Sequence, residues 1–316
     1  MQFGFSLKGW TAIDVGGAPS LCAVSVKTGA RGGDRPQVLA AAEVAQPVAG
    51  EEAAALRDLL GRVDRRLPML VTLPHSQYRL RVMPEPAVPA REMLTSLRWS
   101  LGAESDGPMD DQNLAWMRIP TEEQLPARPK QLYAVMTPKA ALEERLTAWR
   151  QAGLKPKVVD IRETALRNIA GALERPGEGL VLVSVDAGGV GMVFTHQGAL
   201  YLDRYIEQPL AELRAADPET RERLHQRIAQ QLLRSIDVVG RSYPFMPIAR
   251  VVVAPSPEAL GLFEYLSAQL PLPVEALELG KLFDLSQAPA LAQSPALQAR
   301  CLVALGAALR GVKVVA

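Results

Sequence analysis

Residues 179–207 read GLVLVSVDAGGVGMVFTHQGALYLDRYIE, and the prediction of the fold starts from their pattern. The apolar run at 181–185 predicts a buried strand that ends in the turn Asp186–Gly189. A hairpin follows, with predicted strands at 191–195 and 199–202 and a glycine turn between them. The order is therefore strand, acidic glycine turn, strand, turn, strand.

The turn itself combines Asp186 with Gly188 and Gly189. An acidic side chain at a strand end, beside glycine amides that no side chain covers, can hold a hydrated metal ion and receive a phosphate. Asp-Gly turns also occur in plain hairpins. One such turn alone therefore does not decide between a phosphate site and a hairpin.

The same order recurs near the N-terminus, which favours the phosphate site. A strand at 10–13 leads into the turn Asp14–Gly17, and strands at 21–26 and 37–41 are predicted to follow. Two copies of one strand–turn pattern in one chain indicate an internal duplication.

Each set of three strands precedes a helix and one more strand. In the first copy the helix is predicted at 51–66 and the strand at 69–73; in the second the helix begins at Asp217 and the strand lies at 250–254. The sequence therefore predicts an α/β fold built from two β-β-β-α-β units.

Composition narrows the classes of function. The chain has 316 residues, with 35 Lys and Arg against 34 Asp and Glu, so a formal charge of +1 gives no general attraction to nucleic acid or anionic lipid. The 2 cysteines lie in apolar stretches, which suits a reducing cytoplasm. We see no targeting leader, and no apolar run reaches the roughly 18 residues that a membrane span needs.

The duplicated units and an insert divide the chain into predicted parts. The pattern of the first unit is interrupted after its fourth strand, and a small α+β segment intervenes before an apolar strand returns to that unit. The predicted parts are a first subdomain at 1–75, an inserted subdomain at 76–155, a return to the first subdomain at 156–178, a second subdomain at 179–293 and a C-terminal helix at 294–316 that packs back on the first.

Helix starts and one close contact can also be predicted. Pro89 fits a first helical position, and both Ser256-Pro257 and Ser294-Pro295 are typical of a cap followed by a first residue. Gly306 lies in the middle of the last predicted helix, where glycine costs about 1 kcal/mol relative to alanine. We therefore expect close packing against a neighbour at Gly306.

The duplicated turns, the insert and the final helix, which reads ALGAALR at 304–310, resemble the actin-like PilM proteins of type IV pilus assembly. The passage 131–160 is similar to the one that leaves the insert in that family. Within the family, the chain most resembles the MshI group of mannose-sensitive haemagglutinin (MSHA) pilus assembly. The resemblance covers nearly the whole chain and implies an actin-like fold of duplicated RNase H-like units.

In that fold, the two acidic turns face each other across a cleft, bind nucleotide phosphates through glycine amides and hold magnesium through water. The resemblance therefore implies ATP and Mg²⁺ as cofactors, with no protein-only metal site. The residues that it implies for cofactor binding are Asp14, Gly16 and Gly17 in the first turn and Asp186, Gly188 and Gly189 in the second.

Three features differ from the PilM pattern. The first turn continues as 18–21 without a lysine, and Pro255 and Pro257 stand where PilM has a glycine pair on the adenosine side. Proline removes an amide donor there. The segment 207–217 is also short. These differences weigh against ATP and Mg²⁺ binding, so we expect no catalytic residues.

The first hypothesis is a cytoplasmic scaffold, peripheral to the inner membrane through its partner. It would bind the N-terminal tail of a PilN- or MshJ-like single-span protein, with the pilus motor ATPase as a second partner and with no nucleic acid and no direct membrane insertion. In the PilM family the tail groove lies near the region equivalent to Pro84–Pro89.

The alternative hypothesis is an active ATP-binding actin-like ATPase or small-molecule kinase, which rests on the two acidic turns. A kinase also needs a carboxylate base, and no candidate can be named from the sequence. The histidines, at 75, 196 and 225, have no ligand spacing typical of a metal site.

Overall fold

The computed structural model describes residues 9–16, 20–29, 34–47, 51–103, 109–121, 129–258 and 260–311. Its first sheet has the strand order β3-β2-β1-β4-β8. β2 is antiparallel to β1 and β3, whereas β4 is parallel to β1 and β8. These strands are β1 Gly9–Asp14, β2 Ser20–Lys27, β3 Gln37–Ala45, β4 Met69–Thr72 and β8 Pro156–Asp160.

The second sheet repeats this plan, with the order β11-β10-β9-β12-β13. Its first three strands are antiparallel and its last two run parallel to β9. The predicted duplication of an α/β unit is therefore confirmed. The strands are β9 Gly179–Val185, β10 Gly189–His196, β11 Ala199–Glu207, β12 Ile248–Val253 and β13 Val274–Ala276.

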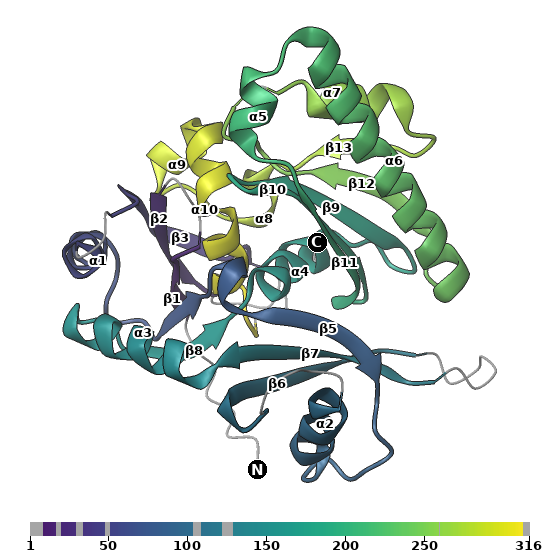
Figure 1. Ribbon diagram of the computed structural model, residues 1–316. Coiled ribbons are helices and arrows are strands. Elements are labelled where there is room, and N and C mark those ends of the chain that lie inside the picture. Colours follow the sequence, from purple (N-terminus) through teal and green to yellow (C-terminus); the bar gives the residue numbers. More distant parts are fainter. Residues whose placement is uncertain are drawn as a thin grey trace.

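A third sheet, in the order β5-β7-β6, belongs to the segment between β4 and β8. It has its own apolar core with the helix α2, and it lies beside the first unit in Figure 1. Its elements are η1 His75–Gln77, β5 Arg79–Pro84, α2 Met93–Gly102, η2 Met109–Asp111, β6 Gln112–Ile119, β7 Gln131–Pro138 and α3 Lys139–Gln151. We propose the division 76–155 for this inserted subdomain, together with the other limits predicted above.

Two helices lie between the two large sheets. α10 (Pro295–Ala308) contacts β1, β2 and β4 of the first sheet, and α4 (Arg162–Leu173) contacts β9, β10 and β11 of the second. The helices also pack on each other, as the centre of Figure 1 shows. The two units are therefore joined through one apolar layer, because α4 and α10 share a core cluster with both sheets.

Gly306 lies where α10 meets α4. A Cβ at this position would lie 2.2 Å from the carbonyl oxygen of Ala165 and 3.1 Å from the side chain of Ile169. The carbonyl oxygen of Gly306 in turn accepts a hydrogen bond of 2.9 Å from Asn168 Nδ2. The predicted close packing at Gly306 is thus confirmed.

The predicted cap of the last helix is also confirmed, because Ser294 Oγ accepts a hydrogen bond of 3.2 Å from the amide of Leu297. We expect Ser294→Ala to lower the free energy of unfolding by about 1 kcal/mol, since the amide loses its partner. Urea denaturation of both proteins at one temperature measures this difference. A change below a few tenths of a kcal/mol would contradict the assignment of the cap.

Three predicted helix limits were wrong. α1 is Glu52–Gly61 and does not reach residue 66, because the chain turns there and Ser25 Oγ accepts the amide of Asp64. α2 begins at Met93, after a turn in which the amide of Glu92 donates to the carbonyl of Pro89.

Ser256-Pro257 does not cap a helix. α7 is Leu262–Gln269, and its N-cap is Gly261 with φ +70°, a left-handed conformation that glycine adopts readily. The short segment 207–217 holds a helix of its own, α5 Leu210–Ala215.

The remaining helices cover the second unit and lead back to α10. Asp217 caps the long α6 (Pro218–Ser242), as predicted, by accepting the amide of Thr220 at 2.9 Å. α8 Leu279–Leu282 and α9 Pro289–Gln293 follow. Within the described ranges, none of the helices is both long enough and apolar enough to cross a bilayer.

Candidate functional site

The first acidic turn lies at the carboxyl end of β1. Asp14 Oδ1 accepts hydrogen bonds from Thr72 Oγ1 at 2.7 Å and from the amide of Gly16 at 3.0 Å. The register of the parallel strands places Thr72 directly beside Asp14. Burial raises the pKa of Asp14, while the two hydrogen bonds and the nearby Arg162 oppose the rise. Gly17 lies outside the described residues.

The second acidic turn closes on itself. Asp186 Oδ1 accepts the amides of Gly188 and Gly189 at 2.9 and 3.0 Å, and the hydroxyl of Tyr205 at 2.7 Å. Its other oxygen, Oδ2, forms an ion pair of 3.1 Å with Nε of Arg162. Both glycine amides and both carboxylate oxygens of this turn thus have partners within the protein.

Arg162, the first residue of α4, is 7% exposed, and several residues contact its guanidinium. Nη2 donates to Ser184 Oγ at 2.9 Å, and the guanidinium carbon lies 5.1 Å from the centre of the Tyr205 ring. A Cβ on Gly191 would approach Nη2 to 2.2 Å. The missing side chain of Gly191 therefore makes the room that the guanidinium fills.

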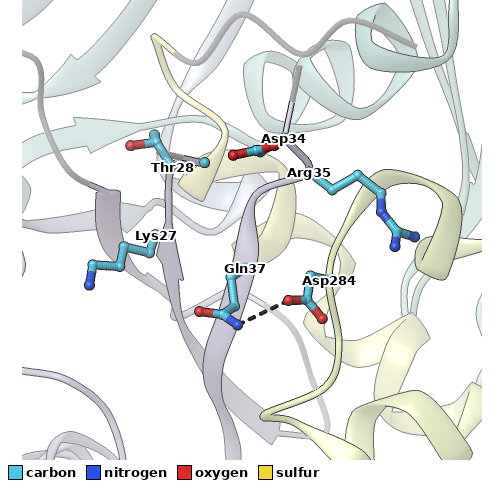
Figure 2. Close-up of a pocket in the computed structure, with 7 residues that line it drawn as sticks. Lys27, Thr28, Asp34, Arg35, Gln37 and Asp284 are labelled. Atoms are coloured by element: carbon cyan, nitrogen blue, oxygen red, sulfur yellow. Dashed lines mark hydrogen bonds between the residues drawn. The ribbon is translucent and has the colours of Figure 1, made fainter. Parts of the chain in front are cut away.

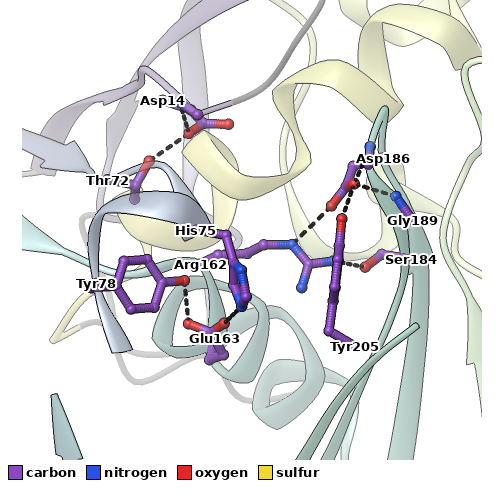
Figure 3. A network of polar contacts seen from close by, with 12 residues as sticks. Asp14, Thr72, His75, Tyr78, Arg162, Glu163, Ser184, Asp186, Gly189 and Tyr205 are labelled. Atoms are coloured by element: carbon purple, nitrogen blue, oxygen red, sulfur yellow. Dashed lines mark hydrogen bonds and ion pairs between the residues drawn. The ribbon is translucent and has the colours of Figure 1, made fainter. Parts of the chain in front are cut away.

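Figure 3 shows Arg162 between the two acidic turns, with Asp14 on one side and Asp186 on the other. Asp186 raises the pKa of Asp14 by like-charge repulsion, and Arg162 lowers it. The two predicted turns thus face one another, and a cation of the chain itself lies between them.

Glu163, the residue after Arg162, contacts a different set of side chains. Glu163 Oε2 accepts the hydroxyl of Tyr78 at 2.6 Å, and Oε1 lies 3.7 Å from His75 Nε2. The ring of His75 stacks on that of Tyr205 at 5.0 Å, so it also touches the network of the second turn. Burial and the Glu163 carboxylate raise the pKa of Tyr78, which keeps its hydroxyl protonated.

His75 and Tyr78 also form part of a groove with a volume of about 1360 Å³. One wall comes from 75–81 and the other from α3, while η2 and Asp203 of β11 contribute from further along the chain. The residues of α3 and its approach that line it are Pro138, Ala141, Glu144, Arg145 and Ala148. The groove therefore lies where the inserted subdomain meets the first unit, and Asp203 comes to it from the second.

The pKa of Asp203 is raised well above that of an ordinary aspartate. Burial and the neighbouring Glu163 carboxylate raise its pKa to about 7, against the opposing effect of Arg162 and Arg204. A carboxylate whose pKa rises on folding binds more protons in the folded state, so stability falls as the pH rises from about 4 to about 7.

We expect Asp203→Asn to reduce this pH dependence. Between pH 5 and pH 7, wild-type stability should fall relative to the variant by up to about 1.4 kcal/mol per pH unit, the limit for one proton. Urea unfolding of both proteins across that range gives the difference. Parallel curves would show that Asp203 does not titrate there.

Sequence reasoning found the two turns but missed Arg162, Glu163, Tyr78 and Tyr205. An Arg-Glu pair at a helix start is typical of a solvated surface.

A second, shallower pocket of about 630 Å³ lies at the edge of β3 (Figure 2). Gln37 Nε2 donates to Asp284 Oδ2 at 2.9 Å, and the backbone of Asp284 bonds to that of residues 36 and 38. The charged residues that line the pocket are Lys27, Asp34, Arg35 and Asp284, two of each sign. We interpret it as a join between the units rather than a ligand site.

No group of three or more His, Cys, Asp or Glu side chains in the described part of the chain has a geometry that could hold a metal ion. His75, His196 and His225 belong to separate surroundings, with neighbours in the groove, near Phe245 and against Tyr265.

The repeated sheet order, the paired acidic turns at the ends of β1 and β9, and the two helices between the sheets define an actin-like fold. Comparison with solved structures agrees. The PilM-PilN type IV pilus biogenesis complex contains a chain that matches with a TM-score of 0.73 and 22% identity, over 96% of this chain and 99% of that one.

Two other solved structures are similar at a lower score. The cytoplasmic domain of EpsL, an inner membrane component of the type II secretion system of Vibrio cholerae, matches with a TM-score of 0.46 and 13% identity, over 85% of this chain and 84% of that one. A protein of actin-like ATPase fold from Bacteroides thetaiotaomicron gives 0.47 and 12%, over 92% and 98%. No protein-family model and no curated protein matches the chain.

Proposed function

We propose that this protein is a scaffold of type IV pilus assembly. The observation that carries the proposal is the groove between the insert and the first unit. The fold of this chain matches that of a chain in the PilM-PilN complex over nearly its whole length. The occupant of the groove is the N-terminal cytoplasmic tail of a PilN-like single-span protein of the inner membrane. The protein then acts on the cytoplasmic side of that membrane.

The groove suits an extended peptide. One wall is β5, an edge strand that pairs with β7 on one side only, so its other side leaves backbone donors and acceptors for a docked segment. The residues of β5 that line the groove are Arg79, Leu80 and Arg81, and those of α3 include Ala141 and Glu144. The lining thus offers apolar side chains together with charges of both signs.

The described residues of the two turns do not fit a magnesium nucleotide. The amides of Gly16, Gly188 and Gly189 already donate to the carboxylates of their own turns. Asp186 is paired with Arg162, whose positive charge repels a metal ion at the same place. Both facts support a scaffold over an ATPase or a kinase, and the proposal includes no catalytic step.

The finer assignment follows the sequence resemblance: the assembly is that of an MSHA-type pilus, the tail is that of a MshJ-like protein, and the pilus motor ATPase is the second partner. Co-purification from cells that express the chain with either a PilN-like or a MshJ-like protein tests this choice. Recovery of the PilN-like protein alone would contradict the MSHA assignment and leave the scaffold role in place.

A pair of neighbouring alanines tests the groove. Ala141 lines it and Ala140 does not, although both are exposed on α3. We expect Ala141→Trp to weaken binding of a fluorescent tail peptide at least about tenfold, because the indole fills the groove. Ala140→Trp should bind like the wild type. Equal affinities for all three proteins would place the peptide elsewhere.

A further inference from the structure

We propose that Arg162 is the resident cation between the two acidic turns. Its guanidinium lies where the sequence resemblance implies a hydrated metal ion, and it holds the two units in one arrangement without a ligand. This inference does not depend on the docked tail, because it rests on the contacts of Arg162 alone.

The balance of charge around Arg162 supports this role. Besides Asp186 in direct contact, its field acts on Asp14 and Asp203, and the Glu163 carboxylate acts on it. Four acidic side chains thus share one buried guanidinium. Without it, these carboxylates would have no compensating charge from Arg162, and like charges in a buried site repel strongly.

The residues around the Arg162 side chain suit a guanidinium. Nη2 donates a hydrogen bond to Ser184, Nε forms an ion pair with Asp186, and the guanidinium carbon lies over the ring of Tyr205. The opposite strand leaves space only because residue 191 is glycine. A lysine ammonium carries the same charge but has neither the fork nor the plane that these contacts use.

Arg162 is also connected with the groove. Arg162 and Glu163 are consecutive on α4, so a displacement of the start of this helix moves both the guanidinium and the carboxylate that accepts the Tyr78 hydroxyl. Tyr205 contacts both Arg162 and His75. The wall of the groove is therefore linked to the ion pair between Arg162 and Asp186.

Three substitutions separate the charge of Arg162 from its packing. Arg162→Ala and Arg162→Gln remove the charge, and Arg162→Lys keeps it. Each purified protein is titrated with MnCl₂ and with MgCl₂, without nucleotide, in a calorimeter, and its melting temperature is measured with and without the salts. Arg241→Gln, on the exposed face of α6, is the control.

We expect no response from the wild type or the control. Both neutral variants should melt several degrees lower and should recover part of the loss with Mn²⁺, which they bind at least about tenfold more tightly than the wild type does. Arg162→Lys should also melt lower but show no gain in Mn²⁺ binding, because its charge remains.

Two results would overturn the inference: Mn²⁺ binding by the wild type as tight as by the neutral variants, or neutral variants that are folded and do not bind it. If Arg162→Ala does not fold, Arg162→Gln gives the answer, since the amide keeps most of the volume and a donor for Ser184. If neither neutral variant folds, a folded Arg162→Lys supports the need for a positive charge, and a folded Arg162→Lys that gains Mn²⁺ binding over the wild type contradicts it.

Discussion

Replacement of Gly306 by alanine is expected to lower the free energy of unfolding by about 3 kcal/mol, the upper end of the usual cost of overpacking. The added methyl carbon would lie 2.2 Å from the carbonyl oxygen of Ala165, a backbone atom that cannot rotate away. α10 and α4 must then separate. Because these helices join the two sheets, both units should lose stability together.

Urea unfolding followed by circular dichroism measures this loss, and Gly240→Ala is the matched control. Gly240 lies within α6, and a Cβ there meets no atom within 4 Å. Alanine should be neutral at this position or stabilise the helix by up to about 1 kcal/mol. A similar effect of both substitutions would contradict the packing described at Gly306.

The second large effect is expected from Trp149→Ala, at about 3–5 kcal/mol. Trp149 is fully buried on α3, in a cluster with Leu56 and Leu59 of α1 and with Leu154. Its indole anchors the helix that forms one wall of the groove. We therefore expect the variant to lose tail binding as well as stability.

Trp99→Ala provides the control for this substitution, because Trp99 is 79% exposed on α2. Its removal should change the free energy of unfolding by less than about 0.5 kcal/mol, as is usual for a surface site. Melting curves of both variants, followed by peptide titration of the folded protein, test the prediction. A Trp149 variant as stable as the Trp99 variant would contradict the assigned core.

The parts of the fold that could be predicted are those with local signals. The two acidic glycine turns, the strand patterns, the cap at Ser294 and the glycine at 306 each depend on a few neighbouring residues, and each lies where the sequence placed it. The residues at which helices begin and end were less predictable. At Ser256 a cap signal was overridden by the left-handed turn at Gly261, which starts the helix later.

The candidate site was harder to predict, for a physical reason. Arg162 on α4 is neutralised by Asp186, which directly follows β9, and nothing near Arg162 in sequence distinguishes it from a solvated arginine. The groove likewise combines 75–81, η2, α3 and Asp203, which only the tertiary fold brings together. The sequence therefore predicted the turns, and the structure was needed to find what lies between them.

The most direct measurement is a fluorescence anisotropy titration of the labelled tail peptide of the candidate partner with this protein, in the presence and absence of magnesium ATP. A scaffold in which Arg162 lies between the two acidic turns should bind the peptide with the same micromolar affinity under both conditions. Binding that requires magnesium ATP would contradict the account, and so would the absence of binding by a protein shown to be folded.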